Sequence, residues 1–203
     1  MKRAFAPAAE TARIDFAQPL DAAAPRLRCA FGVPRQVLVA QQVGEVRAVL
    51  NAVHAAAERG HWCVGYVRYE AAPAFDVALQ THAADGPLAW FAVHHAPQPW
   101  PAEALQEAAR VEWHSSLERS AFDAALGRIQ QAIGAGELYQ VNYTAPLTGA
   151  LQGGAAALFA ALQRAQPGGY AAHIDAGGEQ LLSVSPELFF DWRDAPSGGD
   201  ILA

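Results

Sequence analysis

The sequence contains few of the residues that build disulfide frameworks and nucleic-acid surfaces. Its 203 residues include a single lysine, Lys2, and two cysteines, Cys29 and Cys63. Two cysteines are too few for a disulfide framework, so we expect both to be small, buried apolar residues. The formal net charge is -6, and no cluster of lysine or arginine is present. A nucleic-acid partner is therefore not expected, because nothing would neutralise a phosphate backbone.

Long apolar runs are also missing from the sequence. No uninterrupted stretch approaches the roughly 18 apolar residues of a membrane-spanning helix, so we expect no integral membrane protein. With no apolar signal segment at the N-terminus and so few cysteines, we expect a cytoplasmic location. Hydrophobic residues make up 52% of the chain and charged residues 17%. This composition predicts a globular protein with a buried core and a small-molecule partner.

Three segments have the apolar spacing of amphipathic helices. The first begins at Glu45 and ends before Gly60. The second covers residues 120–136, where Ser120 and Asp123 have the spacing of a capping box. The third ends at the sequence QPGG, which is a typical helix stop.

Strands are expected in the runs of aromatic and β-branched residues between these helices. They are 61–72, 87–96, 136–147 and a hairpin over 170–190 that turns at Gly177–Gly178. Strands joined this closely pair in antiparallel fashion. We therefore expect a mixed α+β fold with largely antiparallel sheets and packed helices. The proline-rich connection 96–110 is the expected boundary between an N-terminal region, 1–110, and a second region, 111–203.

Glu187, in the sequence SVSPELFF, is the first candidate for chemistry. It follows a proline and precedes Leu188, Phe189 and Phe190. Apolar surroundings raise the pKa of a carboxyl group, which suits that group to act as a general acid near neutral pH. The local sequence alone favours a solvated turn glutamate, because strongly perturbed carboxyl groups are a minority.

Gln140, Asn142 and Thr144 alternate along the expected strand 136–147, which places them on one face. Their uncharged groups can orient a polar ligand, but they cannot abstract a proton near pH 7. The solvent-facing side of a half-buried strand explains the same pattern equally well. The adjacent residues His94 and His95 would point to opposite faces of a strand, so we assign no metal site.

Three segments, in this order and at this spacing, resemble the chorismate-utilising enzymes, the family of anthranilate synthase component I and aminodeoxychorismate synthase component I. They are GELYQVNYTAPL, QPGGYAAHID and LLSVSPELFF. The N-terminal half adds GHWCVGYVRYEAAPAFD and PLAWFAV, which look most like the aminodeoxychorismate branch that leads to para-aminobenzoate and folate. The resemblance runs from about Phe31 to Ala203. It implies part of the fold of anthranilate synthase component I.

The resemblance implies an enzyme that replaces the 4-hydroxyl of chorismate with an amino group. The ammonia comes from a glutamine amidotransferase subunit or domain, and magnesium is required. Glu187 matches the family's Ser-Pro-Glu glutamate, which is implicated in proton transfer to the departing hydroxyl. Gln140 stands where water-adding relatives carry a lysine that activates water, which favours an ammonia-using branch. Gln140, Asn142 and Thr144 then form a wall of the chorismate pocket.

Two departures from the family pattern bear on these expectations. Pro167, Tyr170 and Ala171 match a Pro-x-Pro-Tyr segment that helps family members to bind tryptophan, but Gly169 replaces the second proline. The family's Pro-x-Lys-Gly-Thr segment, whose lysine attacks the chorismate ring, and its magnesium-binding glutamates do not occur in these 203 residues. Lys2 cannot replace that lysine.

We therefore expect the N-terminal portion of an aminodeoxychorismate synthase component I, truncated before its lysine motif and inactive by itself. Two alternatives stay open. One is anthranilate synthase component I, and the other is a non-catalytic module that binds tryptophan or docks onto an amidotransferase partner.

Overall fold

The computed structural model describes residues 10–21, 23–102, 108–195 and 198–202. Its contacts divide the chain into two compact units. The first unit is formed by Met1–Leu105 together with Phe159–Ala203, and the second by Gln106–Leu158. Two separate stretches of sequence thus build the first unit.

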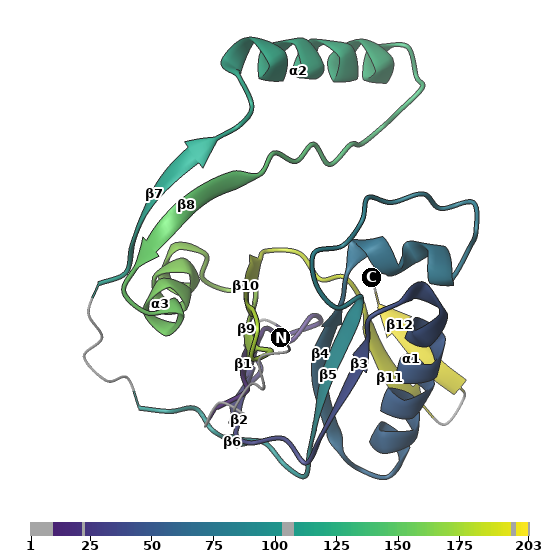
Figure 1. Cartoon of the computed structure of the whole chain (residues 1–203), viewed down its shortest axis with the longest axis vertical. Helices are drawn as coiled ribbons and strands as arrows, with labels where there is room; N and C mark the ends of the chain where they lie inside the picture. Colours follow the sequence, from purple (N-terminus) through teal and green to yellow (C-terminus); the bar gives the residue numbers. More distant parts are fainter. Residues whose placement is uncertain (1–9, 22, 103–107, 196–197, 203) are drawn as a thin grey trace, which may run out of the picture. The chain divides into compact units, whose positions relative to one another are not determined.

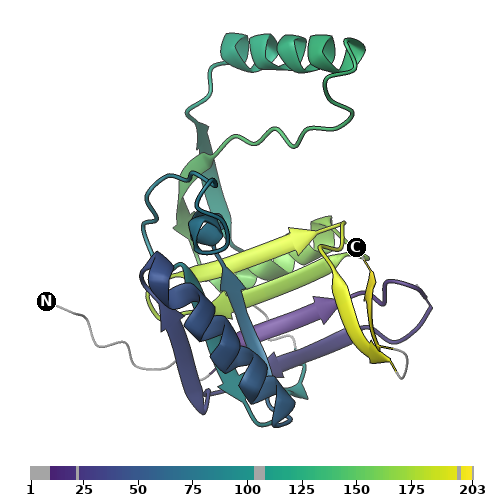
Figure 2. The ribbon, with the colours of Figure 1, turned by 90° about the vertical axis from the view of Figure 1, so that its right-hand side faces the viewer.

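The first unit contains a five-stranded sheet with the order β10-β9-β1-β2-β6, seen in Figure 2. Its strands are β1 (Ala12–Phe16), β2 (Leu27–Phe31), β6 (Gln98–Pro99), β9 (Tyr170–Asp175) and β10 (Gln180–Ser185). Strand β1 pairs with both β2 and β9, so it joins the two stretches of the unit. The expected hairpin at Gly177 is confirmed, because β9 and β10 pair and Gly177 has a φ of 81°.

A second sheet of the same unit has three strands, in the order β3-β5-β4. They are β3 (Gln36–Ala40), β4 (Trp62–Val67) and β5 (Ala89–His94), and helix α1 (Val43–Glu58) packs on one face of this sheet. Helix α1 confirms the first expected helix, and it begins with a capping box between Gln42 and Glu45.

The strand expected over 61–72 ends early, at Val67. A 3-10 helix, η1 (Tyr69–Ala74), follows it. Local hydrogen bonds satisfy this backbone: the Ala71 N–H donates to the Arg68 carbonyl at 3.0 Å, and the Phe75 N–H to the Ala72 carbonyl at 2.9 Å. These residues therefore need no neighbouring strand.

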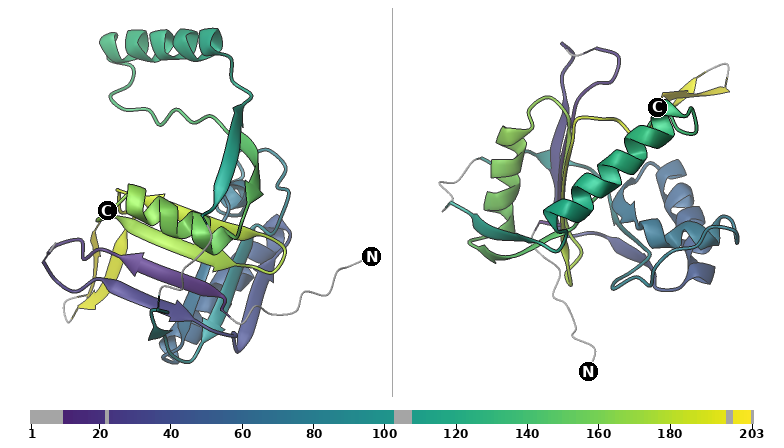
Figure 3. Two further views of the ribbon diagram at one scale, coloured as in Figure 1. Left: turned by 90° about the vertical axis from the view of Figure 1, so that its left-hand side faces the viewer. Right: turned by 90° about the horizontal axis from the view of Figure 1, so that it is seen from above.

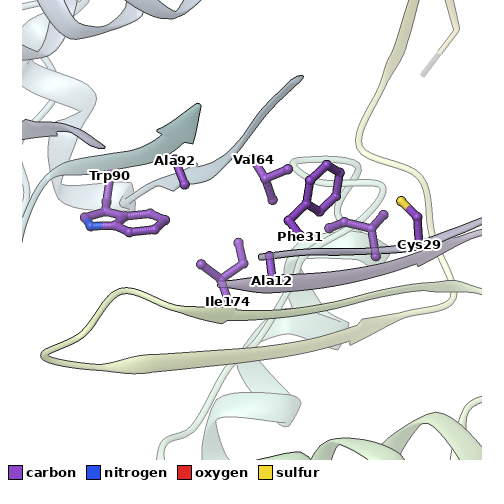
Figure 4. Packing of buried hydrophobic residues seen from close by; sticks show 8 residues of the cluster. Ala12, Cys29, Phe31, Val64, Trp90, Ala92 and Ile174 are labelled. Carbon is purple, nitrogen blue, oxygen red and sulfur yellow. The ribbon is translucent and has the colours of Figure 1, made fainter. Parts of the chain in front are cut away.

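The two sheets of the first unit face each other across the main hydrophobic core. Figure 4 shows Val64, Trp90 and Ala92 of the three-stranded sheet opposite Phe31 and Ile174 of the five-stranded sheet. All of these side chains are buried, and Phe31 is only 1% exposed. Burying such side chains is the largest favourable contribution to folding, at roughly 25 cal/mol per Å² of apolar surface.

Helix α3 (Ala155–Ala165) lies on the outer face of the five-stranded sheet, as Figure 3 shows. Phe159 of the helix packs on His173 of β9, with 5.5 Å between ring centroids. This helix confirms the third expected helix. Side chains alternate along each strand, so Ile14 points into the core while Asp15 points toward α3.

The second unit contains a two-stranded sheet and one long helix, labelled in Figure 1. Strands β7 (Arg110–Ser115) and β8 (Leu147–Gln152) pair in antiparallel fashion, and α2 (Arg119–Gly134) lies between them in sequence. The expected helix is confirmed, but its capping box is not. Glu118 is the N-cap without a side-chain capping bond, and Asp123 instead binds Arg119 of the helix at 2.8 Å.

The strand pairings of the described residues are all antiparallel, including the hairpin of β11 (Asp191–Ala195) and β12 (Gly198–Leu202). The fold is thus α+β with antiparallel sheets and packed helices, as expected. Within the described residues, no helix has the length and apolar character required to cross a membrane.

Candidate active site

A cavity of about 710 Å³ lies in the first unit, where β10 leads through a turn toward β11. Glu187 lines it from this turn, with Tyr170 of β9 and Phe16 of β1 on other walls. Its further walls include Gln18, Ser183, Ser185, Leu188, Phe189, Asp191, Trp192 and Arg193. The volume falls within the range of about 300–1,000 Å³ that is usual for small-molecule sites. Aromatic rings, hydroxyls and charged groups together suit a small ring compound with polar substituents.

The turn that carries Glu187 is held by the preceding serine. The Glu187 N–H donates to Ser185 Oγ at 3.2 Å, and Ser185 Oγ donates to the Glu187 carbonyl at 2.9 Å. Hydroxyl-to-backbone bonds of this kind stabilise tight turns. A side chain at Gly169 would place its Cβ 2.0 Å from the Ser185 carbonyl oxygen. The glycine that replaces the family's second proline therefore allows the Glu187 turn to approach β9.

Arg193 is the cationic residue that lines this cavity. Its guanidinium donates to Asp191 Oδ2 at 2.9 Å from Nε and to Gln18 Oε1 at 3.1 Å. The hydrogen bond and the negative charge of Asp191 raise the pKa of Arg193 further, so the residue remains positively charged. The cavity thus contains a fixed cation beside two carboxylates, and one of these, Asp191, is neutralised by that cation.

The apolar surroundings expected around Glu187 are only partly present. Glu187 itself is exposed. The neighbouring rings do not cover it, because Phe189 is 88% exposed and Phe190 51%. In the first unit taken by itself, Glu187 keeps its contact with water, so its role as a general acid stays a prediction.

The strand expected over 136–147 is wrong. Strand β8 begins only at Leu147, where it pairs with Ser115, and β7 offers no partner for the residues before it. A strand without a partner leaves its N–H and C=O groups unpaired, so the preceding segment is irregular. Gln140, Asn142 and Thr144 lie in this segment of the second unit and are exposed. Their alternating order therefore does not define the face of a sheet, and their role in substrate binding stays a prediction.

Pro167, Tyr170 and Ala171 do not share one pocket. Tyr170 lines the Glu187 cavity, and its ring contacts Phe16 edge-on at 5.8 Å. Pro167 and Ala171 line a different cavity of about 380 Å³ beside α3. Consecutive residues of a strand point to opposite faces, which explains why Tyr170 and Ala171 separate.

Among the described residues, no group of three or more histidine, cysteine, aspartate or glutamate side chains has an arrangement that could hold a metal ion. Magnesium prefers several oxygen ligands in nearly octahedral geometry. The magnesium requirement that the resemblance implies therefore stays a prediction.

Sequence reasoning missed Phe16, Gln18 and Arg193 as residues of the Glu187 cavity. The first two precede Glu187 by about 170 positions and reach it only because β1 pairs with β9. Arg193 lies close to Glu187 in sequence, but it begins the polar segment RDAPSGG, which has the composition of a turn. Only the geometry of the hairpin β11–β12 brings its guanidinium to the cavity.

A model of the family described as chorismate binding enzyme matches residues 9–197. The chain belongs to this family. No curated protein and no solved structure gave a significant match. The matched residues include Glu187 and Arg193 of the cavity as well as Gln140, Asn142 and Thr144 of the second unit.

Proposed function

We propose that this member of the chorismate-binding family acts in the aminodeoxychorismate branch, as part of a component I that aminates chorismate at C4. The observation that carries the proposal is the family match over residues 9–197, within which Glu187 of the Ser-Pro-Glu motif lines the cavity of about 710 Å³ in the first unit. Chorismate is a ring compound with two carboxylates. The aromatic walls and Arg193 suit such a ligand.

In this proposal, Glu187 provides the proton that the leaving hydroxyl needs. A hydroxide ion leaves poorly, so the carboxylic acid transfers its proton to the 4-hydroxyl oxygen, the C–O bond breaks and water departs. The amino group enters from ammonia, which a glutamine amidotransferase partner supplies. Arg193 holds one substrate carboxylate. The proposed substrate-binding role of Gln140, Asn142 and Thr144, which belong to the second unit, rests on the family resemblance alone.

These residues by themselves are limited in two respects. The branch's nucleophilic lysine has no counterpart in the 203 residues, because Lys2 is the only lysine. Among the described residues, no group of three or more histidine, cysteine, aspartate or glutamate side chains is arranged to hold the magnesium ion that the proposal assigns to the intact enzyme. We propose that the chain binds chorismate but needs a complementing segment or chain for turnover, with residues 1–110 as an N-terminal region and 111–203 as part of the chorismate-binding region.

Incubation of the purified chain with chorismate, magnesium and ammonium tests these limits. We expect no aminodeoxychorismate above background by chromatography, whereas chorismate still binds. Formation of aminodeoxychorismate by the chain alone would contradict the requirement for a complementing part. Formation of anthranilate by the complemented enzyme would contradict the branch assignment.

A further inference from the structure

The cavity of about 380 Å³ beside α3 has a charged lining that neither the family match nor the proposed function explains. Four charged side chains line it: Asp15, Arg26, Arg28 and Arg164. Three of these are arginines, so the local charge is positive in a chain whose net charge is -6. The cavity belongs entirely to the first unit and lies on the face of the five-stranded sheet that α3 covers.

Asp15, the single acidic side chain that lines this cavity, already has hydrogen-bonding partners. Asp15 is buried, with 8% of its surface exposed. Arg26 Nε donates to Asp15 Oδ1 at 2.5 Å, and Gln163 Nε2 donates to Asp15 Oδ2 at 3.2 Å. Arg26 also donates to the Gly169 carbonyl at 2.7 Å, which fixes its guanidinium in place. Asp15 and Arg26 therefore neutralise each other, because a buried charge is tolerated only when it is paired.

Arg28 and Arg164 provide the remaining positive charge. The Nε atom of Arg28 lies 3.8 Å from Asp15 Oδ2, and its guanidinium carbon lies 4.5 Å from the centre of the Trp100 ring. Arg164, on α3, has no ion-pair partner in the part of the chain that the structure describes. Arginine forks bind carboxylate and phosphate groups through paired N–H donors. Arg28 and Arg164 thus line a cavity in which the negative charge of Asp15 is already neutralised.

We propose that this cavity binds a small dianion, a dicarboxylate or a phosphate, between Arg28 and Arg164. Pro167 and Ala171 form part of its wall, and the resemblance assigned both residues to tryptophan binding. The charge of the lining instead favours a ligand with two negative charges, since tryptophan carries one carboxylate and an ammonium group. This inference concerns a cavity other than that of Glu187, so it does not depend on the proposed function.

Isothermal titration of the whole chain with succinate and, separately, with inorganic phosphate tests the inference. We expect at least one of them to bind, more weakly as sodium chloride is added, because salt screens the charges. Arg164→Gln removes an exposed side chain, so the fold should remain, yet affinity should fall about tenfold for the loss of charge-assisted hydrogen bonds. Arg28→Gln should have a similar effect. Arg128→Gln, an exposed arginine of α2, is the matched control and should bind as the unaltered chain does.

Each result of these titrations either supports the inference or overturns it. Binding of succinate alone would identify the ligand class as dicarboxylate, and binding of phosphate alone would identify it as phosphate. The inference would be overturned if neither dianion bound, or if Arg164→Gln bound as tightly as Arg128→Gln. Tryptophan binding in the absence of any dianion binding would also overturn it. Should Arg28→Gln fail to fold, as judged by circular dichroism, the Arg164 variant decides the result.

Discussion

His94 is a titratable side chain inside the core of the first unit. It is 4% exposed, its ring lies 5.0 Å from that of Phe31, and its Nε2 atom has no hydrogen-bond partner among the described residues. Burial lowers the pKa of His94 below the usual 6.5, because the charged imidazolium would lose its hydration. This residue makes the stability of the fold depend on pH.

We predict that the free energy of unfolding decreases as the pH falls below about 6.5. Below this pH the unfolded chain binds a proton at His94 and the folded chain does not. The contribution of neutral His94 to stability is therefore complete above pH 6.5 and is lost below it. One such group contributes at most about 1.4 kcal/mol per pH unit. His61, whose pKa is lowered by partial burial and then by nearby Arg35, acts in the same direction.

Urea unfolding at pH 7, 6 and 5 measures this effect. His94→Phe keeps an aromatic ring beside Phe31 and removes the titrating nitrogen, so the decrease should become smaller in this variant. An unchanged pH dependence in His94→Phe would show that His94 is not its source.

At the scale of the elements, Glu179 ties the hairpin β9–β10 to the three-stranded sheet. Its carboxylate accepts hydrogen bonds from Tyr66 and from Arg68, which lie 113 and 111 positions away in the sequence. Burial, then the hydrogen bond and charge of Glu179, raise the pKa of Tyr66, so its hydroxyl remains a donor. This contact joins the two sheets beside the buried Trp90, whose ring stacks on Tyr66 at 6.3 Å.

We predict that Glu179→Ala lowers the free energy of unfolding by roughly 1–3 kcal/mol, because it leaves the Tyr66 hydroxyl without its acceptor. Arg68 loses the same acceptor but keeps its contacts with the Pro87 carbonyl and Asp85. Glu58→Ala removes an exposed glutamate of α1 whose ion pair with His54 lies at the surface, so it should cost less than about 1 kcal/mol. Chemical denaturation of both variants gives the comparison. Equal losses in the two variants would refute a special role for Glu179.

The Glu187 turn depends on the close approach of β9 and the end of β10. We predict that Gly169→Ala destabilises the fold by roughly 1–3 kcal/mol, because the new Cβ would lie 2.0 Å from the Ser185 carbonyl and the backbone must shift. Gly127→Ala is the control: it lies in α2 with open space around it, and it should stabilise the helix by about 1 kcal/mol. Thermal unfolding measures both variants, and a neutral Gly169→Ala would contradict the packing described for the turn.

The elements show which features sequence reasoning can reach. The sequence predicts the three helices and the hairpin at Gly177 because their signals are local. These signals are the regular spacing of apolar residues along a helix and the presence of glycine at a turn. The segment before β8 was not predictable, because whether a run of alternating residues forms a strand depends on a partner elsewhere. The capping box at Ser120 failed for a local reason: the helix begins at Arg119, so Ser120 lies inside the first turn, and Asp123 pairs with Arg119. Likewise, the alternation of β9 separates Tyr170 from Ala171, but which cavity each residue meets depends on strands distant in sequence.

At the scale of the whole molecule, apolar side chains remain on the surface of both units. In the second unit, Ala125 is the one buried apolar residue among those described, while Trp113, Leu126, Tyr139 and Leu147 are exposed. In the first unit, Phe189, Trp192 and Ile201 are exposed. Large exposed apolar patches favour association.

We predict that the isolated chain self-associates at micromolar concentration. Light scattering coupled to gel filtration should show a mass above 21.5 kDa that rises with loading concentration. Leu126→Ser, which removes an apolar side chain from the surface of α2, should reduce the effect, whereas Arg128→Gln on the same helix should not. A monodisperse monomer at every concentration would contradict the prediction.

The central claim is that chorismate binds in the Glu187 cavity, and isothermal titration with chorismate at neutral pH tests it most directly. Arg193→Gln should weaken binding about tenfold, because a charge-assisted contact to a substrate carboxylate is lost. Glu187→Gln should retain binding, since that residue acts in proton transfer and does not hold a substrate carboxylate. The absence of binding, or a loss confined to Arg164→Gln beside α3, would contradict the claim.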